Sequence, residues 1–249
     1  LNILSLDLPG HGNSEGPCID SIEKIADWIQ LLPASQNHHH RLPGGLIRHS
    51  LEVSYYLIAK SQSEILGKKN RILSTFPQHE VSSRYLVIAC LYGLLHDIGK
   101  VISDISVSVN DGGLKWSPYR QSLYEFVTEN ASDGKYFIKY EARTNKQHEI
   151  FNITVLHHFL TEDLIDYLTF SGKNNVLLHQ LVILISGTSI HKDSDIDRLI
   201  TLLHEAEGES ISRDMAGETD VIDSVKRPKP LHEQVVAKIL HMIDVSELK

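Results

Sequence analysis

The segment from Arg84 to Leu95 most restricts the fold of this chain, because it is apolar on nearly every side. A helix that is apolar all round must be covered by other elements, so this segment is predicted to be a buried central helix. It stops at His96-Asp-Ile-Gly99, where glycine supplies a helix terminus. A mainly α-helical chain is therefore expected, with a polar His-Asp pair directly after its most apolar helix.

Apolar residues at helical spacing predict further helices on both sides of this segment. The predicted ranges are 21–32, 46–61, 121–130, 147–160, 162–170, 175–186 and 195–207, with a terminal helix over 231–243 after a Pro-Lys-Pro linker. Residues 208–226 are polar and acidic, without a clear apolar face, and are not predicted to be helical.

A small β-hairpin is predicted between the central helix and residue 121. Residues 102–109 alternate in polarity, residues 110–113 are turn residues, and residues 114–119 can pair back as a second strand. The fold class expected is thus a helical bundle with a small β-hairpin insertion.

Composition limits the class of protein. A chain of 249 residues with 41% hydrophobic residues can bury the core of one large domain. Cys18 and Cys90 have no metal-motif spacing and form no disulfide framework, which fits a reducing cytoplasm. No apolar run is expected to be long enough to span a bilayer, and no insertion into a membrane is expected. The net charge of −8 argues against a broadly basic nucleic-acid surface, although a local basic groove remains compatible with it.

The glycine-rich stretch from Leu6 to Gly16 resembles the segment that precedes the nucleophile of α/β-hydrolases. That fold also needs a G-x-S-x-G elbow and alternating strands and helices. The chain has no such elbow and its downstream pattern is helical, so the stretch is interpreted as a surface loop.

His49, His96 and Asp97 are predicted to be metal ligands. His49 lies in the first turn of one predicted helix, and the His-Asp pair ends the helix that would pack against it. Taken alone, each of these residues is as easily a capping or surface residue. Their combination in one pattern favours a metal site. Imidazole and carboxylate together suit Mn, Fe, Zn or Ni better than Ca. Such an ion polarises a phosphoryl oxygen and activates water, and Lys100 is placed to meet the phosphate.

Three segments of the sequence carry a family resemblance. Gly44-Gly-Leu-Ile-Arg-His-Ser-Leu-Glu-Val53 and Gly93-Leu-Leu-His-Asp-Ile-Gly-Lys100 resemble the HD-domain superfamily of metal-dependent phosphohydrolases. Leu32-Pro-Ala-Ser-Gln-Asn-His-His-His-Arg41 is similar to the MobH class of TraI-like conjugative relaxases of integrating conjugative elements. The resemblance implies an HD-type domain over 1–215 with an insertion at about 101–140. Residues 216–249 would then form a linker and the start of a C-terminal region.

The resemblance also implies site residues. His49, His96 and Asp97 match the first three ligands of the superfamily, and Glu207 stands where its last ligand is an aspartate. The longer side chain of glutamate would displace the carboxylate by about a bond length, which puts metal affinity in question. Asp193 or Asp195 is a competing placement, although both are more simply explained as helix-start acids.

Further histidines are expected near this site. His148 matches a family histidine that would bind a second ion or the phosphate, so one or two ions are expected. On the predicted helix, His158 lies about 80° from His148, whereas His157 lies roughly opposite. The loop of His38, His39 and His40 is expected to line the site, with Arg41 meeting phosphate.

The function implied is metal-dependent nicking or processing of single-stranded DNA at a transfer origin, together with proteins of the conjugation machinery. The catalytic residues would be Asp97, Lys100 and Arg41. The attacking group could be water or a hydroxyl, but core packing is the favoured role of the candidate tyrosines, Tyr55, Tyr56, Tyr136 and Tyr140. Alternatives are an HD phosphohydrolase of nucleotides, a 3′→5′ exonuclease, or a non-catalytic HD fold that binds DNA or a partner. Helicase activity is not expected, because the sequence has no G-x-x-x-x-G-K-[ST] phosphate loop.

Overall fold

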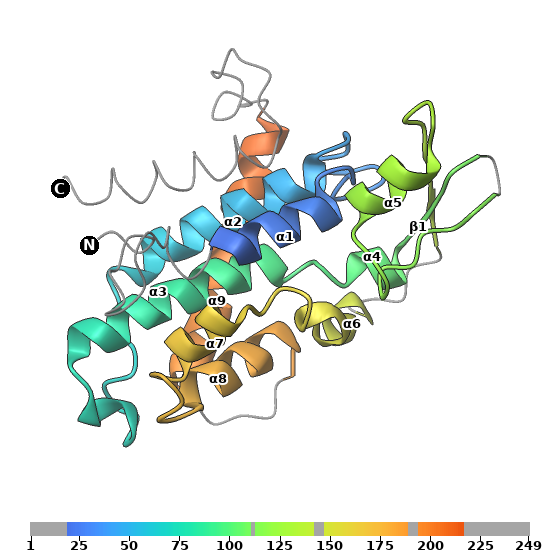
Figure 1. Ribbon diagram of the computed structural model, residues 1–249. Helices are drawn as coiled ribbons and strands as arrows, with labels where there is room; N and C mark the ends of the chain where they lie inside the picture. The colour runs from blue at the N-terminus through green and yellow to red at the C-terminus, as the bar shows by residue number, and fades with distance from the viewer. Residues whose placement is uncertain (1–18, 111–112, 142–146, 189–193, 217–249) are drawn as a thin grey trace, which may run out of the picture.

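The computed structural model describes residues 19–110, 113–141, 147–188 and 194–216 (Figure 1). The predicted N-terminal loop, the Pro-Lys-Pro linker and the helix over 231–243 therefore lie outside the described residues. Within the described ranges the protein is mainly helical, with one small antiparallel sheet, as the sequence predicts.

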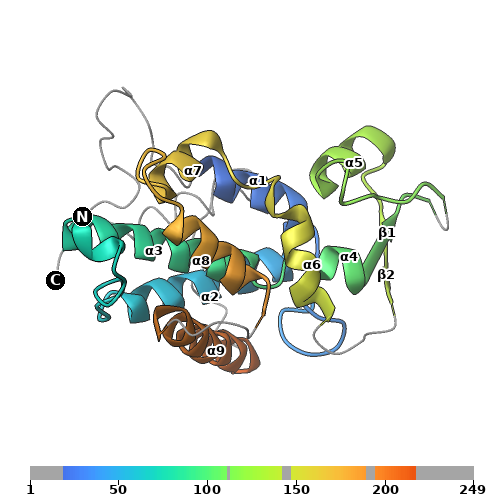
Figure 2. The ribbon, with the colours of Figure 1, turned by 90° about the horizontal axis from the view of Figure 1, so that it is seen from below.

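Three helices form the centre of the molecule. Helix α2 (Gly45–Ser61) packs along both α3 (Gln78–Leu95) and α9 (Ser194–Met215). Helices α2 and α3 approach closely where Gly93 lies against the backbone of Ser54. Around them lie α1 (Ile19–Ile29), a 3₁₀ turn (Leu73–Thr75), α6 (Gln147–Leu156), α7 (Glu162–Leu168) and α8 (Val176–Ile185) (Figures 1 and 2).

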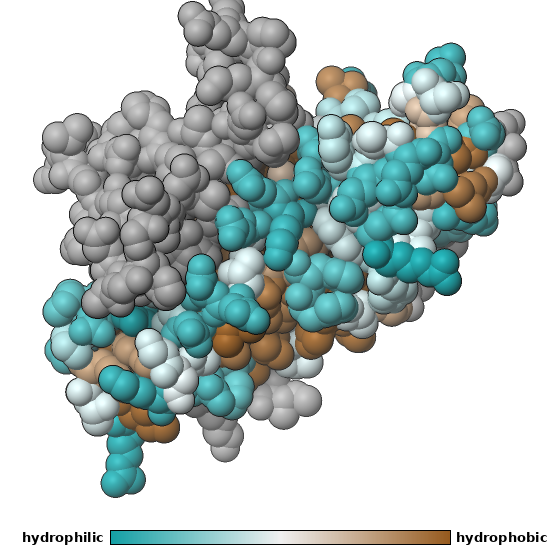
Figure 3. Space-filling view, in the orientation of Figure 1, coloured by the Kyte–Doolittle hydropathy of each residue, from teal (hydrophilic) through white to brown (hydrophobic). Residues whose placement is uncertain are grey.

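Helix α3 is the predicted buried helix, and it begins at Gln78 rather than at Arg84. The apolar stretch Gln78–Ser103 is long enough to cross a membrane, so the expectation that no run reaches that length was wrong. Its most apolar window is 83% buried inside the protein, which identifies it as a core helix. Hydrophilic residues predominate on the described part of the face in Figure 3.

The insertion contains α4 (Lys100–Ser103), β1 (Ile105–Ser108), α5 (Leu123–Asn130) and β2 (Phe137–Tyr140), grouped to one side of the bundle (Figure 2). The predicted hairpin is confirmed only in part. Strand β1 pairs with β2, from Ile105 opposite Tyr140 to Ser108 opposite Phe137. The predicted partner, residues 114–119, pairs back only at its start, through a bridge between Ser108 and Lys115 and two flanking backbone hydrogen bonds. Alternation identified a strand, but the more distant partner has no local turn signal.

The helix ends differ from the predicted ones by a few residues, except at α9. Helix α9 continues to Met215, so the prediction that residues 208–215 are not helical was wrong. The reason is that polar contacts rather than apolar ones hold this end of the helix. Ser210 is fully buried and hydrogen-bonded, and Asp214 accepts a hydrogen bond from the backbone N–H of His40 at 2.8 Å.

Candidate metal centre

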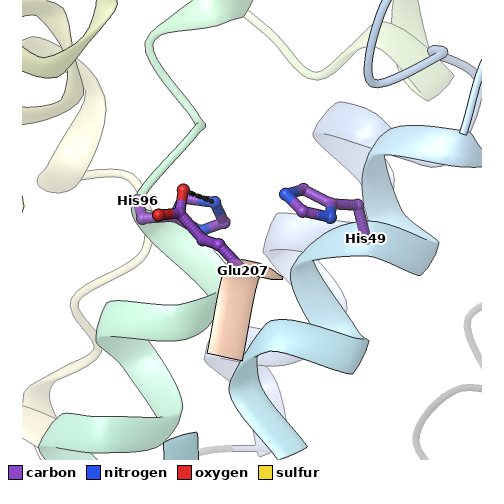
Figure 4. Close-up of side chains that lie close together, drawn as sticks. All are labelled: His49, His96 and Glu207. Carbon is purple, nitrogen blue, oxygen red and sulfur yellow. Dashed lines mark ion pairs between the residues drawn. The ribbon is translucent and has the colours of Figure 1, made fainter. Parts of the chain in front are cut away.

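The three central helices bring one potential ligand each to a single point. His49 comes from the second turn of α2, His96 follows the last turn of α3, and Glu207 lies in the middle part of α9 (Figure 4). One ligand atom from each residue lies within 4.8 Å of the others. Both imidazoles are buried, and Glu207 is half-buried. Donors this close, with carboxylate and imidazole mixed, can surround one cation.

His96 is oriented so that one ring nitrogen faces the cluster. Its Nδ1–H donates to the carbonyl of Gly93 at 2.7 Å, so in the neutral ring Nε2 carries the lone pair. Nε2 lies 3.4 Å from Oε1 of Glu207, and it is buried without a hydrogen-bond partner among the described residues. A buried polar atom left in this way costs about 1–3 kcal/mol. A ligand at this point would remove that cost.

His49 is held from behind by a chain of hydrogen bonds. Its Nδ1 is 3.0 Å from Oγ of Ser210, and that hydroxyl donates to Oε2 of Glu52 at 2.8 Å. Because the hydroxyl proton points to Glu52, Ser210 accepts from Nδ1–H, and Nε2 of His49 carries the free lone pair. This arrangement of an outer carboxylate and a donating imidazole is usual for histidines that bind metals.

Asp97 lies between two groups of histidines. Its Oδ2 is 3.4 Å from Nε2 of His96 and 3.7 Å from Nε2 of His49, whereas its Oδ1 is 3.3 Å from Nε2 of His148. Oδ2 also accepts a hydrogen bond from Nζ of Lys100. The carboxylate can therefore contribute one oxygen to each side.

The electrostatics of the cluster favour neutral imidazole at His49 and positive charge near the carboxylates. Burial, followed by the neighbouring His96, holds the pKa of His49 well below its usual range. Burial alone would raise the pKa of Asp97, but Lys100 and His96 hold it well below its usual range. Burial would lower the pKa of His96, yet Asp97 and Glu207 raise it. The two carboxylates thus attract a cation to the point that they share with His96.

A cavity of about 510 Å³ opens beside the cluster and is called the metal-side cavity here. The predicted site residues around it are His39, His49, His96, Asp97, Lys100, His148 and Glu207. Tyr92 and Asn152, which the sequence analysis did not single out, also line it. Burial, followed by Glu207 and Glu149, raises the pKa of Tyr92, so its hydroxyl stays protonated.

The remaining members of the histidine loop have different positions. His40 is buried behind the cluster, with Nε2 3.1 Å from Oγ of Ser210 and Nδ1 3.2 Å from Oδ1 of Asp214. His38 is exposed and lines a smaller, separate cavity. Arg41 is exposed and lines neither cavity. The loop therefore contributes His39 alone to the metal-side cavity.

His158 is not brought to the cluster. Helix α6 ends at Leu156, earlier than predicted, so the helical angle between His148 and His158 no longer applies. The ring of His158 packs on Trp28, with centroids 4.7 Å apart. The competing ligand Asp195 instead accepts from the backbone N–H of Gly67 at 3.0 Å, and Asp193 lies outside the described residues.

The candidate tyrosines do not line the metal-side cavity. Tyr136 donates to the carbonyl of Leu31 and Tyr140 to that of Ser35. Tyr56 accepts a hydrogen bond from Arg213, and Tyr55 is 40% exposed.

Sequence reasoning missed the residues that support the ligands. The side-chain N–H groups of Asn152 donate to the carbonyls of His96 and Ile185, and its oxygen accepts from the N–H of Gly99 at 2.6 Å. It thereby fixes the turn that carries the His-Asp pair. Ser210 follows Glu207 by three residues, so helical spacing could have placed it on the same face.

The fold and the cluster together define a helical protein with a histidine–carboxylate site suited to a divalent cation. The TraI_2 family model, described as "Putative helicase", matches residues 17–249. The chain therefore belongs to this TraI-like, conjugation-related family. No curated protein matches the chain. No solved structure matches it either.

Proposed function

We propose that this chain is an HD-type, metal-dependent phosphodiesterase of the MobH class, which nicks or processes single-stranded DNA in conjugation. The observation that carries the proposal is the buried Nε2 of His96, which makes no hydrogen bond to the described residues and lies beside His49 and Glu207. The family match supports a role in DNA processing during conjugation. Work on transfer DNA with the conjugation machinery would take place in the cytoplasm.

The donor set fits a transition metal. His49 and His96 would bind through Nε2, and Asp97 and Glu207 through one carboxylate oxygen each. Two nitrogens and two oxygens suit Mn, Fe, Zn or Ni. His148, facing the other oxygen of Asp97 at 3.3 Å, would serve a second ion. A carboxylate oxygen of Glu207 lies within 4.8 Å of the ligand atoms of His49 and His96. This short distance supports glutamate as a ligand in place of the usual aspartate.

A divalent ion bound here would supply positive charge to a phosphate oxygen and lower the pKa of a bound water. The chain's own residues would bind and orient the substrate around it. Lys100 is buried at the wall of the metal-side cavity and presents an ammonium to a phosphate oxygen. Asp97 pairs with Lys100 and holds that ammonium in place.

The test combines metal content with DNA cleavage. The purified chain should contain Mn, Fe, Zn or Ni and should cut single-stranded oligonucleotides only when metal is present. The double variant His96→Ala/Asp97→Ala should lose both properties. His79→Ala is the matched control, because His79 is an exposed histidine at the other end of the same helix.

Each alternative gives a different result. Release of phosphate from mononucleotides without oligonucleotide cleavage would indicate a nucleotide phosphohydrolase. Digestion from 3′ ends alone would indicate an exonuclease. A chain that binds DNA and takes up no metal after reconstitution would contradict the proposal and leave a non-catalytic fold.

A further inference from the structure

A second cavity, of about 210 Å³, shares Lys100 with the metal-side cavity. We call it the loop-side cavity. Its wall combines the loop after α1, which passes beside α4 and α6 in Figure 2, with the ends of the two strands. The polar side chains of the lining include Gln36, Asn37, Lys100, Asp104, Tyr140 and Glu141.

The loop that forms this wall is fixed by hydrogen bonds of its own. Oγ of Ser35 donates to the carbonyl of His39 at 2.7 Å and accepts from the N–H of His38 at 3.0 Å. The N–H of Ala34 donates to the carbonyl of His40 at 2.9 Å. Tyr140, from β2, donates to the carbonyl of Ser35 at 3.3 Å. The cavity is therefore preformed, as binding sites for small groups usually are.

The lining of the loop-side cavity is polar and partly acidic. The carboxylates of Asp104 and Glu141 line the loop-side cavity, where Lys100 is the one Lys or Arg in the described lining. These acids repel phosphate and accept hydrogen bonds from amino or hydroxyl groups. The exposed amides of Gln36 and Asn37 add donors and acceptors. The lining thus favours an uncharged polar group. On the metal side, where Asp97, Glu149 and Glu207 also line the cavity, phosphate would be bound by Lys100 and the proposed ion.

We propose that the loop-side cavity binds the nucleobase of the nucleotide whose phosphate lies at Lys100. The inference rests on the proposed function and adds a base-selecting subsite to it. Amides of Asn and Gln pair with base edges, and carboxylates accept from base amino groups. The half-buried ring of Tyr140 offers a surface on which a base can stack. Since both cavities share Lys100, one nucleotide can occupy them together.

Binding of deoxynucleoside monophosphates to the full chain tests this, measured by calorimetry with deoxyribose 5-phosphate as the probe that lacks a base. At least one of dAMP, dGMP, dCMP and dTMP should bind about tenfold more tightly than deoxyribose 5-phosphate, the lower end of base discrimination by a bidentate pair. The double variant Gln36→Ala/Asn37→Ala should lose this preference and keep its affinity for deoxyribose 5-phosphate. Both side chains are exposed, so the fold should tolerate the change.

Gln62→Ala is the matched control, because Gln62 is an exposed amide at the end of α2 and lines neither cavity. It should leave the preference unchanged. Equal affinity for nucleotides and deoxyribose 5-phosphate, absence of nucleotide binding, or a preference that survives the double variant would overturn the inference. Oligonucleotide cleavage without base preference would refute the subsite alone. Base preference without cleavage would refute the phosphodiesterase and leave the subsite standing.

Discussion

At the scale of single residues, Ser210 determines how His49 faces the site. One hydroxyl serves two imidazoles, because Oγ lies 3.0 Å from Nδ1 of His49 and 3.1 Å from Nε2 of His40. Its proton goes to Glu52. Ser210 thus ties the histidine loop, α2 and α9 together behind the ligands. The residue type alone does not reveal this positioning role, because a serine on a polar helix end resembles any solvated residue.

Ser210→Ala should lower metal affinity roughly 10- to 100-fold, the usual loss when the outer partner of a ligand is removed. Nδ1 of His49 would lose its acceptor, and the ring would no longer be held in one tautomer. Affinity is measured by competition with a chromogenic chelator. Ser212→Ala is the control, because Ser212 is exposed on the same helix. Equal affinities of the two variants would show that Ser210 does not position His49.

At the scale of elements, the contact between α2 and α3 sets the distance between His49 and the His-Asp pair. Gly93 faces α2 so closely that an added Cβ would lie 2.4 Å from Cα of Ser54. A backbone atom cannot move aside as a flexible side chain can. The helices that carry His49 and His96 can therefore pack this closely only because residue 93 has no side chain.

Gly93→Ala should destabilise the protein by about 1–3 kcal/mol through overpacking, although alanine favours helix more than glycine. Gly208→Ala in α9 is the matched control, because an added Cβ there meets nothing within 4 Å. That variant should be stabilised by about 0.5–1 kcal/mol. Urea denaturation followed by circular dichroism measures both. Stabilisation by Gly93→Ala would show that the helices are free to separate.

The same elements show what the sequence could reveal. The apolar run of α3 predicted a buried helix, because a pattern that is apolar all round has one structural solution. The extension of α9 could not be predicted, since its end is held by Ser210 and Asp214 through long-range polar contacts rather than by an apolar stripe. The partner of β1 was missed for a similar reason. Pairing with Phe137–Tyr140 depends on tertiary contacts that no local turn announces.

The site residues also divide into those that the sequence could reveal and those that it could not. The motifs nominated His49, His96 and Asp97 by residue type, and the structure brings these residues together with Glu207. Arg41 was predicted from the histidine loop and His158 from its helical angle to His148, and the structure places both away from the cluster. A helical angle is a weak guide once a helix ends, because the following residues leave its periodicity.

At the scale of the whole molecule, a bound ion would join the three central helices, since the proposed ligands come from α2, the end of α3 and α9. A ligand that binds only the folded state stabilises it by mass action, by about 2.7 kcal/mol at 100 times the dissociation constant. A domain of this size gains about 2–4 °C in Tm per kcal/mol. Removal of the ion by a chelator should therefore lower Tm by about 5–10 °C, and added Mn²⁺ or Zn²⁺ should restore it.

In His96→Ala, Tm should not respond to chelator or metal, whereas His79→Ala should respond like the unmodified chain. A chelator effect of the same size in His96→Ala would mean that stabilising ions bind elsewhere, which calorimetric melting of the three proteins side by side would reveal.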